Sequence, residues 1–296
     1  MIYSDVLKEN LKLWHDAAAE NRELRLLAVM QAARDAAADW NAGYAQDPTA
    51  WRIPRPRLSS PAPLPTANAF ASALALDEQL AFCRELLSLA PHFPRDDEER
   101  EAPMPFPIAP RLATLGGEFF TEALHGFASV IPHTVPARTN SFSAVLEEVA
   151  IGNADLALLP TEDERGGKRL SLIEECDRLE LHINCVADIP SPHGGRRVQF
   201  ALISRNPTPL LPASGKQMLE CRVFDEDDFA LADFLAAAAA CGLSLSRIDS
   251  LPDSYGEGIF AHHVTLSREQ GDPALLEAYM ALRLPRSFVT GHYLYL

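Results

Sequence analysis

The chain has 296 residues, 47% of them hydrophobic, and a formal net charge of −15 at pH 7. This length and apolar content can bury two cores, so two or three structural units are expected. The acidic balance is unfavourable for binding nucleic acid or an anionic membrane surface. No apolar run approaches the roughly 20 residues needed to cross a bilayer. We therefore expect an ordered cytoplasmic protein that engages neither nucleic acid nor membrane.

Cysteine and histidine patterns bear on cofactors. The five cysteines are widely spaced, without a Cys-x-x-Cys pair or a histidine placed to complete a zinc site. His262 and His263 are adjacent in an expected strand, so their side chains point to opposite faces. We expect reduced, mostly buried thiols, no metal site and no other cofactor.

The first 108 residues are expected to form a helical region with proline-rich linkers. Apolar residues at helical spacing predict one helix over about the first 40 residues and a second that begins near Asp77. Proline is frequent from residue 48 to 65, which favours an extended segment. A charge run and four further prolines between residues 94 and 110 mark the end of this region.

Residues 109–206 alternate short apolar runs with helical patterns, which is typical of βα units around a parallel sheet. The expected strands are residues 111–115, 133–138, 155–160, 180–187 and 198–204, and the expected helices are residues 119–128, 143–151 and 171–178. Only about ten residues separate the last two strands, which permits no more than a turn. Arg196 and Arg197 in that connection are expected to keep the turn soluble.

Residues 216–296 follow the order βαββαβ, the split-βαβ or ferredoxin-like order. The apolar stripe over residues 229–241, with Gly242 directly after it, predicts the first helix of this module. The expected fold class is therefore an α/β lobe followed by an α+β module, preceded by the helical region.

Two segments of the C-terminal module, Phe229-Ala230-Leu231 and Asp249-Ser250-Leu251-Pro252, resemble the ACT domain of the prephenate dehydratase family. That family has Gly-Ala-Leu at the helix start and Glu-Ser-Arg-Pro after the second strand. The resemblance implies a homodimer through this domain and an amino-acid site formed by these seven residues. Because Phe229 replaces the glycine and Leu251 the arginine, we expect phenylalanine binding there to be weak or absent.

The middle segment is similar to the first lobe of the dehydratase domain, a periplasmic-binding-protein-like fold. Three runs occur in the family's order: Leu115 through Ala123, Asn153 through Asp163, and Val198 through Arg205. The resemblance covers residues 109–296. It implies that the family's catalytic positions correspond to Thr121, Glu122, Glu162, Val198, Gln199 and Phe200.

Departures from the family pattern bear on activity. The family inserts a second lobe between the strands that end near Ala187 and begin at Val198, and here it is absent. The family's Thr-Arg pair, which acts on prephenate, is Val198-Gln199, so the hydroxyl and the guanidinium are both missing. Glu118, Glu162 and the acidic residues after it would repel a dicarboxylate.

Two hypotheses follow. In the first, which the departures favour, the chain is a non-catalytic prephenate dehydratase-like protein that binds an amino acid or an aromatic acid, or regulates through its ACT domain. In the second, it is a working prephenate dehydratase that converts prephenate to phenylpyruvate in L-phenylalanine biosynthesis. The missing lobe would then be supplied by the N-terminal helices or by a second subunit.

Overall fold

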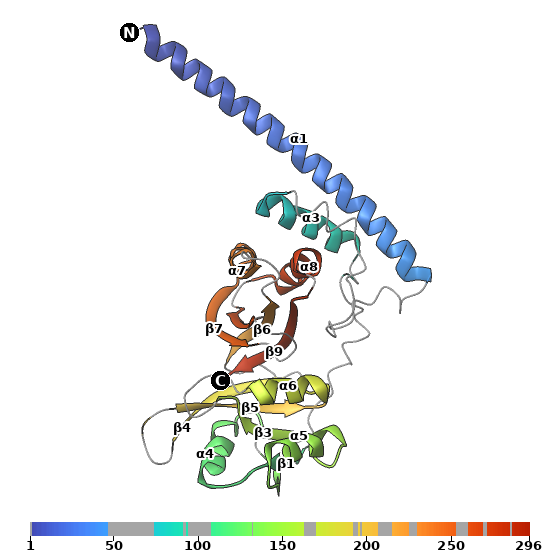
Figure 1. Cartoon of the computed structure of the whole chain (residues 1–296), viewed down its shortest axis with the longest axis vertical. Coiled ribbons are helices and arrows are strands. Elements are labelled where there is room, and N and C mark those ends of the chain that lie inside the picture. Colours follow the sequence, from blue (N-terminus) through green and yellow to red (C-terminus); the bar gives the residue numbers. More distant parts are fainter. Residues whose placement is uncertain are drawn as a thin grey trace. The chain divides into compact units, whose positions relative to one another are not determined.

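The computed structural model describes residues 2–46, 74–90, 93, 108–131, 133–162, 170–191, 195, 197–206, 215–224, 230–252, 260–268, 271–284 and 286–296. The chain divides into two compact units, one made of residues 1–96 and 274–285 and the other of residues 97–273 and 286–296 (Figure 1). None of the described helices is long and apolar enough to span a bilayer.

The first unit contains helices α1 (Ile2–Gln46), α3 (Leu76–Leu89) and α8 (Pro273–Arg283). Helix α1 packs along α3, and its buried residues recur at helical spacing: Val29, Ala33, Ala37 and Trp40. The Trp40 ring lies edge-on to Phe93, with 4.9 Å between centroids. The two predicted N-terminal helices are thus confirmed, and α1 runs six residues further than expected. The proline-rich stretch from residue 48 to 65 lies outside the described residues.

Three ion pairs join α1 to α3. They connect Arg22 with Asp77, Arg25 with Glu78 and Arg34 with Glu85. The arginines are more than half exposed, so the apolar contacts contribute most of the stability of this pairing.

The second unit is built on one sheet of nine strands in the order β2-β1-β3-β5-β4-β9-β6-β8-β7. The strands are β1 (Arg111–Thr114), β2 (Val135–Arg138), β3 (Leu156–Pro160), β4 (His182–Pro190), β5 (Arg197–Ser204), β6 (Lys216–Phe224), β7 (Ser244–Pro252), β8 (Phe260–Ser267) and β9 (Phe288–Tyr295).

The five strands predicted between residues 109 and 206 are adjacent in this sheet, but they are not all parallel. Strands β2, β1 and β3 are parallel, whereas β5 runs antiparallel to both β3 and β4. The expectation of a parallel sheet is therefore wrong for β5, which runs opposite to the other four strands. The connection of six residues between β4 and β5, 191–196, is too short for a crossover and can only return the chain antiparallel.

Helices cover both faces of this part of the sheet. Helix α4 (Glu118–Gly126) packs with Phe127 against Leu156, Leu158 and other residues on one face. Helices α5 (Phe142–Ala150) and α6 (Leu170–Arg178) pack on the opposite face, on which Ala157 and Leu159 lie. This division follows from the alternation of side chains along each strand.

The C-terminal strands form the antiparallel order β9-β6-β8-β7. Helix α7 (Ala230–Ala240) connects β6 to β7, and α8 lies between β8 and β9 in the chain, so the predicted ferredoxin-like βαββαβ order is confirmed. Phe234 of α7 is fully buried, and Gly242 follows the helix with φ 77°. The sequence did not predict that β9 also pairs in parallel with β4, which joins the two groups of strands into one sheet.

Candidate functional site

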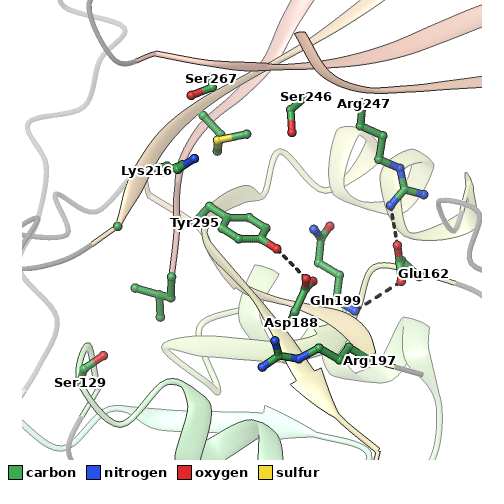
Figure 2. Close-up of a pocket in the computed structure, with 13 residues that line it drawn as sticks. Ser129, Glu162, Asp188, Arg197, Gln199, Lys216, Ser246, Arg247, Ser267 and Tyr295 are labelled. Atoms are coloured by element: carbon green, nitrogen blue, oxygen red, sulfur yellow. Dashed lines mark hydrogen bonds and ion pairs between the residues drawn. The ribbon is translucent and has the colours of Figure 1, made fainter. Parts of the chain in front are cut away.

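An open pocket of about 1260 Å³ lies in the second unit, beside the junction of β4 and β9 (Figure 2). In the sheet register Gln199 is opposite Asp188, and Tyr295 is opposite Lys216 on one side and Val186 on the other. Residues in register project to the same face, so these strands present a row of polar side chains. The pocket is lined by Ser129, Glu162, Asp188, Arg197, Gln199, Gly215, Lys216, Met218, Ser246, Arg247, Ser267, Tyr295 and Leu296.

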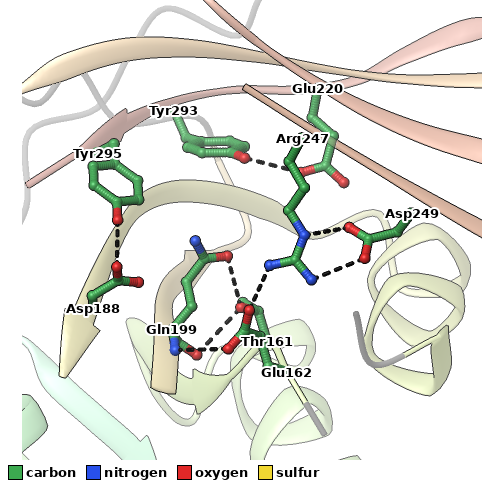
Figure 3. Close-up of polar contacts among 9 residues, drawn as sticks. All are labelled: Thr161, Glu162, Asp188, Gln199, Glu220, Arg247, Asp249, Tyr293 and Tyr295. Carbon is green, nitrogen blue, oxygen red and sulfur yellow. Dashed lines mark hydrogen bonds and ion pairs between the residues drawn. The ribbon is translucent and has the colours of Figure 1, made fainter. Parts of the chain in front are cut away.

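Arg247 is held by two carboxylates from different parts of the chain (Figure 3). Its Nε and Nη2 donate to Asp249 Oδ2 and Oδ1 at 2.6 and 2.9 Å, and its Nη1 donates to Glu162 Oε1 at 2.5 Å. The hydrogen bond to Asp249, with a smaller effect from Glu162, raises the pKa of Arg247 above its ordinary value despite burial. The guanidinium is therefore always charged, and it binds the Asp249 carboxylate through two hydrogen bonds.

Gln199, which the sequence resemblance matched with the family's arginine, contacts the residues at the end of β3. The Thr161 hydroxyl donates to Gln199 Oε1 at 2.9 Å, and the Gln199 backbone N–H donates weakly to Glu162 Oε2 at 3.5 Å. Gln199 thus places a neutral amide in the pocket. Arg197 lies two residues earlier on the same strand, β5, while Lys216 and Arg247 come from β6 and β7.

Two tyrosines on β9 donate to carboxylates. The Tyr295 hydroxyl donates to Asp188 Oδ2 at 2.6 Å, and burial together with this bond raises the pKa of Tyr295 to about 12. The Tyr293 hydroxyl donates to Glu220 Oε2 at 3.1 Å, and burial followed by the charge of Glu220 raises its pKa well above the usual value. Both phenols are therefore neutral hydrogen-bond donors at physiological pH.

The residues that the sequence resemblance matched with catalytic positions do not form one cluster. Glu162 and Gln199 line the pocket. Thr121 and Glu122 are exposed on α4 and lie outside the pocket lining. Val198 is half-buried, while Phe200 is buried with its ring 5.3 Å from that of Phe119 in the core below α4.

The residues predicted for an ACT-type site are partly described. Ala230 is buried and Leu231 half-buried on α7, and Asp249 and Ser250 lie on β7. Phe229 and the side chains of Leu251 and Pro252 lie outside the described residues. Of the four with described side chains, none lines the pocket, yet Asp249 contacts it through Arg247. Arg247 therefore contacts one residue from each predicted site: Glu162 from the predicted catalytic positions and Asp249 from the predicted ACT-type site.

Sequence reasoning missed most of the polar pocket residues, among them Asp188, Arg197, Lys216, Arg247 and Tyr295. Arg197 was expected only to keep a turn soluble. A signal existed for Arg247, because it lies two residues before Asp249 in a strand, so the two side chains share a face. No local signal reveals that β9 pairs with β4. Within the described part of the chain, no group of three or more histidine, cysteine or carboxylate side chains is arranged to hold a metal ion.

Comparison with known proteins bears on the fold. No protein-family model and no curated protein sequence matches the chain. A solved prephenate dehydratase from Streptococcus mutans aligns over 62% of this chain and 98% of its own, with 16% identity and a TM-score of 0.51. The chain has a prephenate dehydratase-like fold.

Two other solved structures are similar. The prephenate dehydratase from Arthrobacter aurescens, in complex with L-Phe, covers 62% of this chain and 89% of its own, with 16% identity and a TM-score of 0.46. GqqA, described as a novel type of quorum-quenching acylase, covers 62% and 94%, with 22% identity and a TM-score of 0.46. Sequence identities at this level leave the chemistry to be argued from the site.

Proposed function

We propose that this prephenate dehydratase-like protein is non-catalytic and binds a small amino acid or aromatic acid in the pocket, acting in regulation. The observation that carries the proposal is the composition of the lining. Three cations, Arg197, Lys216 and Arg247, face two carboxylates, Glu162 and Asp188. Arg197 and Lys216 are exposed, and exposed cations that line a pocket favour an organic acid as the ligand even in a chain of net charge −15.

The remaining lining residues suit such a ligand. Met218 and Leu296 supply apolar surface, and the hydroxyls of Ser246, Ser267 and Tyr295 supply polar contacts. A few polar groups beside apolar surface are typical of small-molecule sites.

Dehydration of prephenate requires a proton donor for the departing hydroxyl and a cation for each carboxylate. Val198 has neither, and the amide of Gln199 is engaged by Thr161. Arg247 is already paired with Asp249 and Glu162. These contacts favour binding over turnover.

The alternative is an active prephenate dehydratase. One observation supports it: the Thr161 hydroxyl contacts Gln199, and Arg197 and Arg247 line the same pocket. A hydroxyl and guanidinium groups are therefore near the position where the sequence lacks them.

An activity assay separates the two functions. Purified protein incubated with prephenate should produce no phenylpyruvate above the buffer rate. Turnover at ordinary enzyme concentration would establish the alternative and contradict the non-catalytic proposal.

A thermal-shift screen with amino acids and aromatic acids should identify the ligand class, because a ligand that binds only the folded state raises the unfolding midpoint. Lys216→Met should remove the shift if the ligand binds in the pocket. Ser250→Ala, in the ACT-type segment, is the matched control and should retain it. If Ser250→Ala removes the shift and Lys216→Met retains it, the ligand binds at residues 249–252 instead of in the pocket.

We further propose that residues 1–108 form a helical region, 109–206 a truncated dehydratase lobe and 216–296 an ACT domain through which the protein forms a homodimer. Strand β7 supports this assembly, since it is an edge strand on which Leu245 is 52% exposed. Light scattering should give a dimer mass that Leu245→Lys reduces to the monomer. Val135→Lys on the other edge strand, β2, should leave the dimer intact.

Two smaller proposals complete this assignment. Phenylalanine should bind weakly or not at all at the ACT-type site, and calorimetry showing micromolar binding that Ser250→Ala abolishes would contradict this. A cytoplasmic location is supported by the five cysteines, which are buried and form no disulfide bond. Cell fractionation tests it directly.

A further inference from the structure

We infer that Arg247 is the residue that recognises the ligand's carboxylate, and that Glu162 binds Arg247 in its place when no ligand is bound. This inference rests on the proposed binding function and names the group within the pocket that selects the ligand. It makes Glu162 an internal competitor that lowers affinity for acids.

The two carboxylates on Arg247 differ in position. Asp249 grips the guanidinium through Nε and Nη2 from a place outside the pocket lining, whereas Glu162 takes Nη1 and lines the pocket together with Arg247 (Figures 2 and 3). The side chain of Arg247 is 29% exposed, and those of Glu162 and Asp249 are similarly buried, at 11% and 14%. Because Glu162 lines the pocket and Asp249 does not, the contact to Glu162 is the one that a ligand in the pocket can reach, and Asp249 orients the cation.

The strengths of the two contacts also differ. Asp249 accepts hydrogen bonds from both Nε and Nη2 of the planar fork, while Glu162 Oε1 accepts from Nη1. A two-point contact is the stronger and more directional arrangement. A ligand carboxylate that replaces Glu162 leaves the Asp249 grip intact and keeps the number of charges on Arg247 unchanged.

The displaced Glu162 carboxylate would still be stabilised by nearby positive charges. Arg197 and Lys216 line the same pocket, and both are exposed. Exchange therefore does not leave a carboxylate buried without a counter-charge, which would otherwise prevent it. Because Glu162 follows β3 and Arg247 lies on β7, exchange would also break an ion pair between segments 85 residues apart in sequence.

Benzoate is a suitable probe, because it is a rigid aromatic carboxylate with a neutral analogue of the same shape, benzamide. Dissociation constants would be measured by calorimetry for the full chain and for Glu162→Gln, Arg247→Gln and Arg247→Lys. Glu175→Gln is the matched control, since Glu175 pairs with Arg178 on α6 and does not line the pocket. Circular dichroism would verify folding of each variant.

Glu162→Gln should bind benzoate about five-fold or more tightly than the wild type, since the amide no longer competes for the guanidinium. Arg247→Gln should lose this binding. Arg247→Lys, which keeps the charge and loses the fork, should weaken it and provides the test if the glutamine variant does not fold. Glu175→Gln should match the wild type, and benzamide affinity should not change in any variant.

Equal benzoate affinity in wild type and Glu162→Gln, or absence of binding to both, would overturn the inference. So would undiminished binding to folded Arg247→Gln or Arg247→Lys. A ligand from the thermal-shift screen that binds wild type and Glu162→Gln equally would leave the proposed function standing while refuting the competitor role. Benzoate binding to Glu162→Gln, with no screened acid binding the wild type, would support the competitor role and refute the proposed function.

Discussion

Replacing Tyr295 by phenylalanine removes one hydroxyl at the β4–β9 junction and should change both stability and its pH dependence. The lost contact is the 2.6 Å hydrogen bond to Asp188 Oδ2. A hydrogen bond to a charged acceptor contributes about 1.5–3 kcal/mol when buried, and partial exposure of this pair reduces that to about 1 kcal/mol. Urea denaturation at pH 8 should show this loss for Tyr295→Phe.

The pH dependence has a definite sign. The pKa of Tyr295 is raised to about 12 in the folded protein from an ordinary value of 10, so the folded state holds the proton more tightly than the unfolded state. The stabilising contribution is fully present below pH 10 and is lost as pH rises through 12. The stability difference between wild type and Tyr295→Phe should therefore shrink between pH 10 and 12.

Asp188→Asn provides the matched comparison. It removes the like charge that opposes ionisation of Tyr295, so the pKa of Tyr295 should fall and the alkaline loss should begin at lower pH. Ultraviolet absorbance of tyrosinate would follow the ionisation. A stability difference that is absent at pH 8, or that is identical at pH 8 and pH 12, would refute this account.

Three further substitutions test packing and ion pairing by chemical denaturation. Phe234→Ala should cost about 3–5 kcal/mol, because the ring is fully buried and its loss leaves a cavity; a cost below about 1 kcal/mol would contradict the α7 packing. Gly271→Ala should cost about 1–3 kcal/mol, since a Cβ there would lie 2.8 Å from the Gly242 carbonyl oxygen; wild-type stability would show that this turn can move. Arg25→Ala should cost below about 1 kcal/mol because the arginine is 61% exposed, whereas Glu78→Ala should cost about 1–2 kcal/mol, because Glu78 is buried and also accepts from the Ala75 N–H at the start of α3. Equal costs for Arg25→Ala and Glu78→Ala would contradict the contribution of the Ala75–Glu78 hydrogen bond to the start of α3.

Most helices and strands were predictable because their signals are local. The stripe of Phe234 and its neighbours has the period of a helix, and Gly242 supplies the positive φ at its end. The βαββαβ order of residues 216–296 follows directly from such signals. Strand direction was less predictable, since β5 has the same apolar texture as the parallel strands and only its short connection to β4 shows the reversal.

The candidate site was predictable only in part. Glu162 and Gln199 were found because they belong to motifs that resemble those of a known family. Arg247, Lys216 and Tyr295 belong to no such motif. Lys216 and Tyr295 lie in strands whose neighbours are far away in sequence, and Arg247 contacts Glu162, which is 85 residues away. Composition did not predict these residues either, because a net charge of −15 does not suggest a pocket lined by three cations.

By itself the sequence determined where helices and strands form, which side chains are buried, and that the C-terminal strands follow a ferredoxin-like order, because these depend on periodicity and turn residues within a few positions. Only the tertiary structure decided that β9 pairs with β4 and that Arg247 reaches Glu162. Such contacts depend on the lateral packing of complete strands, to which no short stretch of sequence is a guide. The pocket forms beside that pairing, so the recognition chemistry of this protein is a property of the assembled sheet.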